Sequence, residues 1–157
     1  MERNMIVFTR SSLHYDISNM AYVAADIKEG TRDAHALHQT FDICGEGNAD
    51  RVDSVLDLAF AEVLVMLGAI AAGGRIHASR HGDFLLELKG EVPLPAVGLI
   101  REAGREYLVA SALADWLAVT LPEAASAWRE KASGVGSVLL AARRSCRALP
   151  RRTSPIA

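Results

Sequence analysis

Cysteine is scarce in this sequence. The 157 residues contain two cysteines, Cys44 and Cys146, which form no CxxC motif and no repeated spacing. A disulfide between them would need a fold that brings these distant positions together, so a reducing compartment is the expectation. Half of the residues are hydrophobic, and a chain of this length can bury one core in a single domain.

The sequence also lacks a hydrophobic run long enough for a membrane span. The most apolar segment, LAFAEVLVMLGAIAA at 58–72, is interrupted by Glu62, whereas a spanning helix needs about 20 consecutive apolar residues. The N-terminal segment MERNMIVFTRSS has too short an apolar run for a signal peptide. We therefore expect a protein that assembles inside a cell and does not contact a membrane.

The motifs of the common enzyme classes are absent as well. There is no GxSxG, no P-loop and no GxGxxG after a predicted strand. Cys44 with His35 or His38 could be drawn as a nucleophile and a base, but no third group completes such an arrangement. We therefore predict a non-enzymatic protein that needs no cofactor.

Acidic residues are absent after Lys131, although five of the 17 basic residues lie there. These five are Arg143, Arg144, Arg147, Arg151 and Arg152. Arginine suits phosphate groups, so the set could lie close to DNA in a nucleic-acid-binding regulator, although no aromatic residue is interleaved to stack on single-stranded bases. The set could equally anchor an acidic protein surface or belong to a solvated basic tail, which we place at 149–157.

Apolar residues recur at helical spacing in five segments, and residues that favour helix ends stand between them. The predicted helices cover about 11–28, 31–44, 49–72, 95–119 and 121–147. The second half of the third helix is apolar nearly all round, which is typical of a helix at the centre of a bundle or in an oligomer interface. Gly73 and Gly74 are expected to end this helix.

The sequence changes period between the third and fourth predicted helices. Phe84, Leu86 and Leu88 alternate with the residues between them, as in a strand. The turn residues at 81–83 then indicate a β-hairpin over about 75–91. The predicted fold is mainly α: a four- to five-helix bundle in one domain, residues 1–148, with this β-hairpin inserted between the third and fourth helices.

The stretch DICGEGNADRVD at 42–53 matches part of the pattern of a calcium-binding EF-hand loop. Its glycine is in place, and four of the five ligand positions carry the carboxylates Asp42, Glu46, Asp50 and Asp53. Cys44, however, is a poor calcium ligand, and Asn48 and Asp50 match the capped start of a helix. We therefore interpret the stretch as the end of one helix and the start of the next.

His35, His38 and Asp42 lie on one side of the second predicted helix, at spacings of 3 and 4 residues. This arrangement could bind a transition metal, which makes a small metal-binding module or a metal-dependent enzyme the alternative function. An ordinary polar helix face, with His38 and Asp42 as an i,i+4 pair, explains the same pattern. No HExxH motif and no fourth ligand accompany these residues, so we predict no metal.

Glu62 and Asp115 are carboxylates that each interrupt an apolar run. A charged side chain that is buried needs a partner. We expect each of them to reach an arginine or a helix end, or to face the rim of the core.

Three segments carry a resemblance to known proteins: SSLHYDISNMAYVAADI, HALHQTFDICGEGNADRVDSVLDLAFAEVL and EYLVASALADWLAVTLPEAASAWREKA. They resemble uncharacterised small helical proteins encoded in prophage-like virion gene modules, over most of residues 11–131. The size and the helix plan are also similar to those of the head–tail adaptor (connector) proteins of tailed phages. Those proteins are small helical subunits that assemble as rings beneath the portal.

The resemblance implies a virion structural protein that forms a homo-oligomeric ring and contacts neighbouring portal or tail proteins. Its expected location is the cytoplasm of the host cell during assembly and then the virion. The resemblance brings no catalytic residue, cofactor or metal ligand to this sequence.

Overall fold

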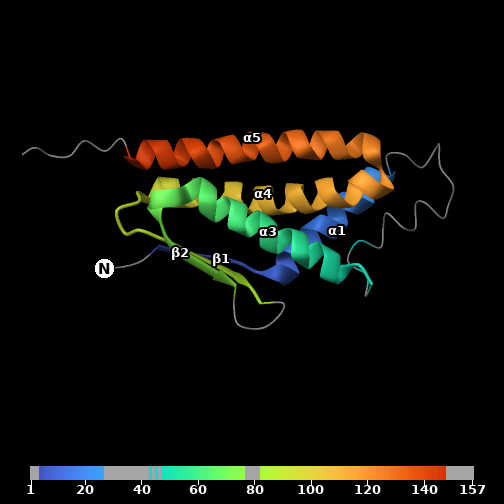
Figure 1. Ribbon diagram of the computed structural model, residues 1–157, viewed down its shortest axis with the longest axis horizontal. Coiled ribbons are helices and arrows are strands. Elements are labelled where there is room, and N and C mark those ends of the chain that lie inside the picture. The colour runs from blue at the N-terminus through green and yellow to red at the C-terminus, as the bar shows by residue number, and fades with distance from the viewer. Residues whose placement is uncertain (1–3, 27–42, 44, 46, 77–81, 148–157) are drawn as a thin grey trace, which may run out of the picture.

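The computed structural model of the protein describes residues 4–26, 43, 45, 47–76 and 82–147. The described elements, in chain order, are β1 (Asn4–Phe8), α1 (Arg10–Asp26), α3 (Ala49–Leu67), the short 3-10 helix η1 (Gly68–Ile70), β2 (Ala71–Ile76), β3 (Phe84–Leu88), α4 (Leu94–Thr120) and α5 (Pro122–Arg147). The fold is mainly helical, as predicted, and includes a small three-stranded antiparallel sheet (Figure 1).

The helices α4 and α5 lie side by side and run in opposite directions (Figure 1). Only Leu121 separates them: its N–H donates to the Leu117 carbonyl over 2.8 Å, and its own carbonyl accepts from Ala124 and Ala125. Pro122 has no N–H to donate and suits the first turn of a helix, so α5 begins there. No helix of the described residues combines the length and apolar character that crossing a membrane requires.

The helix α3 lies obliquely across α4 and approaches α5 at its C-terminal end (Figure 1). It ends at Leu67 because Gly68 takes a φ of 51°, a left-handed conformation that favours glycine. The Gly68 N–H donates to the Leu64 carbonyl and closes the last turn. The predicted helix end at Gly73 and Gly74 is therefore wrong, since both glycines lie in β2.

The sheet has the strand order β1-β3-β2. Along β3, the central strand, buried side chains alternate with half-buried ones, as the sequence pattern predicts. β2 and β3 pair near the expected hairpin, but their pairing starts earlier, with Ala71 opposite Leu88. β1 was not predicted. It pairs Phe8 with Phe84 and Asn4 with Leu88, so the partner that makes this segment a strand is distant in the sequence.

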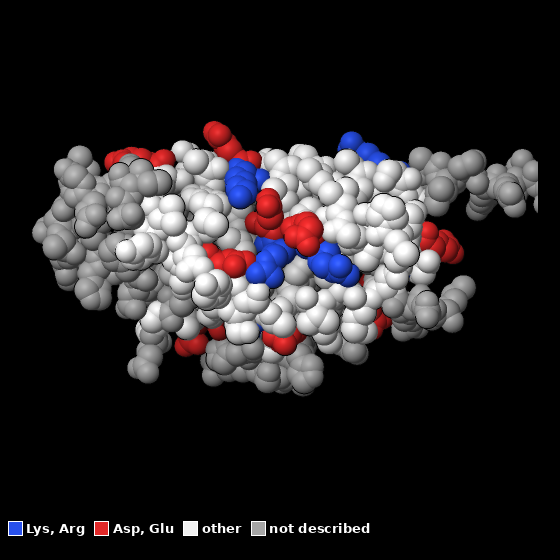
Figure 2. All heavy atoms as spheres, turned by 180° about the vertical axis from the view of Figure 1, so that it is seen from behind, with Lys and Arg blue, Asp and Glu red and all other residues white. Residues whose placement is uncertain are grey.

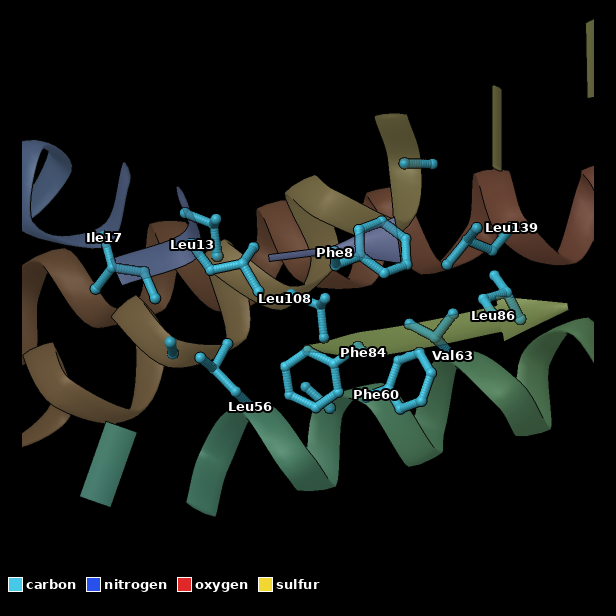
Figure 3. Close-up of a cluster of buried hydrophobic side chains, with 14 of the residues drawn as sticks. Phe8, Leu13, Ile17, Leu56, Phe60, Val63, Phe84, Leu86, Leu108 and Leu139 are labelled. Atoms are coloured by element: carbon cyan, nitrogen blue, oxygen red, sulfur yellow. The ribbon is translucent and has the colours of Figure 1, made fainter. Parts of the chain in front are cut away.

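The core lies where the sheet meets the helices (Figure 3). The Phe60 ring of α3 has its centroid 4.8 Å from that of Phe84 and 6.5 Å from that of Phe8. Leu13 and Ile17 of α1 are fully buried in the same cluster. Burying one such side chain contributes roughly 1.5–3 kcal/mol, so these contacts fix the positions of α1 and α3 on the sheet.

Two parts of the predicted organisation lie outside the described residues. One is the short predicted helix over 31–44, which carries His35, His38 and Asp42; the structure describes only Ile43 of this range, as a buried turn residue. The other is the basic tail at 149–157, which carries Arg151 and Arg152.

Candidate functional site

The helix α3 presents two apolar faces. The face buried in the core carries Val52, Leu56, Ala59, Phe60, Val63 and Leu67. The second face, called the groove face below, carries Leu58, Ala61, Glu62 and Val65. Their spacing of i, i+3, i+4 and i+7 places them on one side of the helix. The two large apolar side chains of this face are open to solvent, with Leu58 63% and Val65 75% exposed.

The groove face borders a surface groove of about 460 Å³. Met66 of α3 and Tyr107 of α4 complete its lining. The helix α5 comes close to this site at Gly136, where an added Cβ would lie 3.3 Å from Met66 Sδ and 3.5 Å from Tyr107 Cε2. Glycine at this position therefore lets α5 approach the side chains that line the groove.

One negative charge lies in this apolar lining. The Tyr107 hydroxyl donates to Glu62 Oε2 over 2.6 Å. Burial, together with the hydrogen bond to Glu62 and the charge of Glu62, raises the pKa of Tyr107 to about 12. Tyr107 is therefore neutral at physiological pH and holds the Glu62 carboxylate in place. Within the described part of the chain, no residue forms an ion pair with Glu62, so its charge is available to a cationic partner.

Asp115, the other carboxylate in an apolar run, has the expected arginine partner. Nε and Nη2 of Arg51 donate to Asp115 Oδ2 over 3.1 Å and 3.0 Å. The two side chains are 45% and 41% exposed, so the pair contributes roughly 0–1 kcal/mol to stability. A second ion pair joins Arg105 of α4 to Asp16 of α1 over 2.9 Å.

On the face shown in Figure 2, charged side chains gather near the middle, and broad areas carry no charge.

A buried ion cluster around Arg10 was not predicted from the sequence. Arg10 is 5% exposed, and its guanidinium lies 4.4 Å from the centroid of the Phe84 ring. Its Nε donates to the Gly82 carbonyl over 2.7 Å and its Nη1 to Asp53 Oδ1 over 3.0 Å. Its Nη2 donates to Asp57. One side chain thus joins the start of α1 to α3 and to the segment before β3.

His14 completes this cluster, with its Nε2 2.8 Å from Asp53 Oδ1. Burial by itself would raise the pKa of the Asp53 carboxyl. The hydrogen bonds and charges of His14 and Arg10 together outweigh burial and lower this pKa below its ordinary value of 3.8. Asp53 is therefore ionised at neutral pH, and the contacts around it hold elements of the fold together.

The stretch 42–53 is described only in part. Asn48 stands at the N-cap of α3, although its side chain makes no capping hydrogen bond, and Asp50 lies in the first turn. Asp53, the last ligand position of the calcium pattern, contacts Arg10 and His14. Across the described residues, no group of three His, Cys, Asp or Glu side chains is placed to hold a metal ion. Outside the described residues lie His35, His38, Asp42, Cys44 and Glu46.

The basic C-terminal residues that the structure describes belong to α5, which ends at Arg147. Arg143 is half-buried and packs against Gly68, with its Nη1 3.1 Å from the position of a Cβ there. Its Nε has no hydrogen-bond partner. Arg144 is exposed, and no residue in the described ranges forms an ion pair with it. Arg144 is therefore better placed than Arg143 to contact another molecule.

The sequence indicated the groove only indirectly, through the apolar second half of the third predicted helix. Tyr107 was missed because it is 45 residues from Glu62 in the chain, and no local pattern joins the two. Comparisons of the chain with protein-family models, with curated proteins and with solved structures gave no match. The groove is therefore interpreted from its own residues.

Proposed function

We propose that this chain is a non-enzymatic structural subunit that works by oligomeric protein–protein assembly. The groove on α3 is the observation that carries the proposal. Leu58 and Val65 expose large apolar side chains beside a groove, and each square ångström of apolar surface that a partner covers contributes about 25 cal/mol. Contiguous apolar surface with a polar rim is typical of interaction sites.

The more specific proposal is that the subunit is a head–tail adaptor, or neck protein, of a phage-like particle. Its support is the sequence resemblance over most of residues 11–131. In this role, copies of the chain form a ring and contact portal or tail proteins, first in the host cytoplasm and then in the virion. The apolar groove supplies a surface of the kind that such contacts use.

The assembly proposal is tested by the mass of the protein in solution, measured by sedimentation velocity over a concentration series. We expect the wild-type chain to form oligomers. The double variant Leu58→Glu, Val65→Glu places two charges beside the groove. It should weaken association at least about a hundredfold, because burying one such apolar side chain contributes roughly 1.5–3 kcal/mol and each tenfold change corresponds to about 1.4 kcal/mol.

The matched control is the double variant Leu94→Glu, Val119→Glu. These residues are 77% and 67% exposed on α4, and neither lines the groove. We expect this control to keep the mass of the wild type, and circular dichroism to show that both double variants are folded. A wild-type chain that is monomeric at every concentration contradicts the proposal, and so does a groove variant that associates as the wild type does.

A further inference from the structure

We propose that the groove of one copy receives the exposed face of α5 from a second copy, and that Arg144 of the second copy pairs with Glu62 of the first. This inference rests on the proposed function, because it names the surface with which each groove assembles. Three features of the described residues carry it: the composition of the α5 face, its fit to the groove, and the charge on each side.

The exposed face of α5 from Ser133 to Ser145 consists mostly of small residues, and Arg144 near its end carries its one charge. This face consists of Ser133, Gly134, Ser137, Val138, Ala141, Arg144 and Ser145. Between Lys131 and Arg143 the sequence has no charged residue, although the solvent side of a surface helix normally carries charged groups. Small side chains shorten the distance at which two helices can pack, so this face suits close contact with another surface.

The α5 face is long enough to cover the groove face. Since an α-helix rises about 1.5 Å per residue, Leu58 and Val65 are about 10 Å apart along α3, and Ser133 and Ser145, the two ends of the α5 face, are about 18 Å apart along α5. The large side chains of the groove face, Leu58 and Val65, can then lie against small residues of the α5 face. Packed helices interdigitate in this way, with side chains of one filling the spaces on the other.

Charge favours the α5 face as the occupant. Glu62 places a carboxylate in the groove, where Tyr107 holds it. Arg144 carries the one charge of the α5 face and lies near its end, and within the described residues it forms no ion pair. A guanidinium can donate two parallel hydrogen bonds to one carboxylate. A two-fold contact of groove with groove is disfavoured, because it brings two Glu62 carboxylates together.

The proposed contact joins two different surfaces of the molecule. Every copy therefore offers one groove to one neighbour and one α5 face to another. Contacts of this kind close into a ring when the rotation between neighbours allows it and extend into a filament when it does not. The ring that the adaptor proposal requires is one of these two outcomes.

The test uses two charge variants of the full chain, Glu62→Arg and Arg144→Glu, and measures mass by sedimentation velocity. Each variant alone places like charges across the contact, so we expect association at least about tenfold weaker than in the wild type. An equal mixture of the two variants restores opposite charges at every contact between unlike copies. We expect this mixture to recover association, with unlike copies alternating.

Arg129→Glu is the matched control, because Arg129 is also exposed on α5 but lies outside the proposed face. We expect this variant to associate as the wild type does. Arg144→Gln removes the charge without reversing it and should cause a smaller loss, which gives a second reading if the reversed charge disturbs the fold. Circular dichroism checks the fold of each variant.

The outcomes separate this inference from the proposed function. Association that survives Arg144→Glu but is lost in the Leu58→Glu, Val65→Glu variant overturns the inference alone, because another surface or another protein then occupies the groove. A mixture that fails to recover association also overturns it. A wild-type chain that never associates overturns both proposals.

Discussion

At the scale of single residues, the fold depends on one buried guanidinium. Arg10 contacts α3 through Asp53 and Asp57, and the segment before β3 through Gly82. A charge removed from water costs several kcal/mol unless it is paired and hydrogen-bonded. The three contacts form together only when α1, α3 and the segment before β3 all hold their native positions.

Replacing this guanidinium should destabilise the fold strongly. The variant Arg10→Met leaves the Asp53 side chain, which is 10% exposed, without its arginine. We expect the free energy of unfolding to fall by about 3 kcal/mol, at the low end of the range for a broken buried pair, because His14 still contacts the Asp53 carboxylate. Arg51→Met breaks the exposed pair with Asp115 and should cost about 1 kcal/mol or less. Urea denaturation measures both losses, and equal losses contradict the role assigned to Arg10.

Tyr107 determines a pH dependence on the alkaline side. Its pKa is raised from 10.0 to about 12 in the folded chain, so folding favours the neutral phenol. This contribution to stability is fully present below pH 10 and is lost as the pH rises toward 12.

The variant Tyr107→Phe has no phenol to ionise at this site, so its stability should fall less steeply over this range. Urea denaturation at a series of pH values measures the difference. The tyrosinate absorbance of the wild type minus that of the variant reports the pKa of Tyr107 directly. Parallel pH profiles for the two proteins would show that folding does not protect this phenol.

At the scale of elements, α3 has two apolar faces. An apolar surface on all sides is typical of a central helix or of an interface helix. The structure buries Leu56 and Val63 in the core and leaves Leu58 and Val65 exposed, so it confirms the contribution to the core, and the interface role stays a proposal. The same helix therefore stabilises the fold and supplies the groove.

The end of α3 depends on a glycine. Gly68→Ala forces a Cβ into a conformation with a φ of 51°, and the new atom would also lie 3.1 Å from Arg143 Nη1. We expect a loss of about 1–2 kcal/mol in the free energy of unfolding, because L-residues avoid this conformation. Gly98→Ala is the control within α4, where an added Cβ meets no atom within 4 Å. This control should raise the free energy of unfolding by roughly 0.5–1 kcal/mol. If both variants change the free energy of unfolding in the same direction, the role assigned to Gly68 is contradicted.

At the scale of the whole molecule, α5 has a different role on each of two sides. One side packs along α4 and approaches the groove at Gly136. The other side is the α5 face of mostly small residues, with Arg144 as its one charge. A rigid helix pair of this kind holds the groove and the α5 face in a fixed relation. In the proposed assembly, this fixed relation would also fix the angle between neighbouring copies, which decides between a ring and a filament.

The positions of the helices were predictable because helix signals are local. The predicted helix at 95–119 corresponds to α4 (Leu94–Thr120), and the one starting at 11 corresponds to α1, which starts at Arg10. Both boundaries follow from apolar spacing and from proline or polar residues next to it. The true end of α3 was missed because β2 forms by pairing with β3, and strand pairing outweighed the apolar pattern that favoured a longer helix.

The sequence by itself determined the helical class, the positions of α1, α4 and α5, and the alternation of β3, because each of these depends on residues within a few turns of one another. Only the tertiary structure decided that Asn4–Phe8 forms the strand β1, that the Arg10 cluster forms, and that Tyr107 pairs with Glu62. These contacts join residues that are far apart in the chain, for example the 45 positions between Glu62 and Tyr107. The residues in each of these contacts meet only after the helices have packed, so no local sequence pattern predicts the contacts.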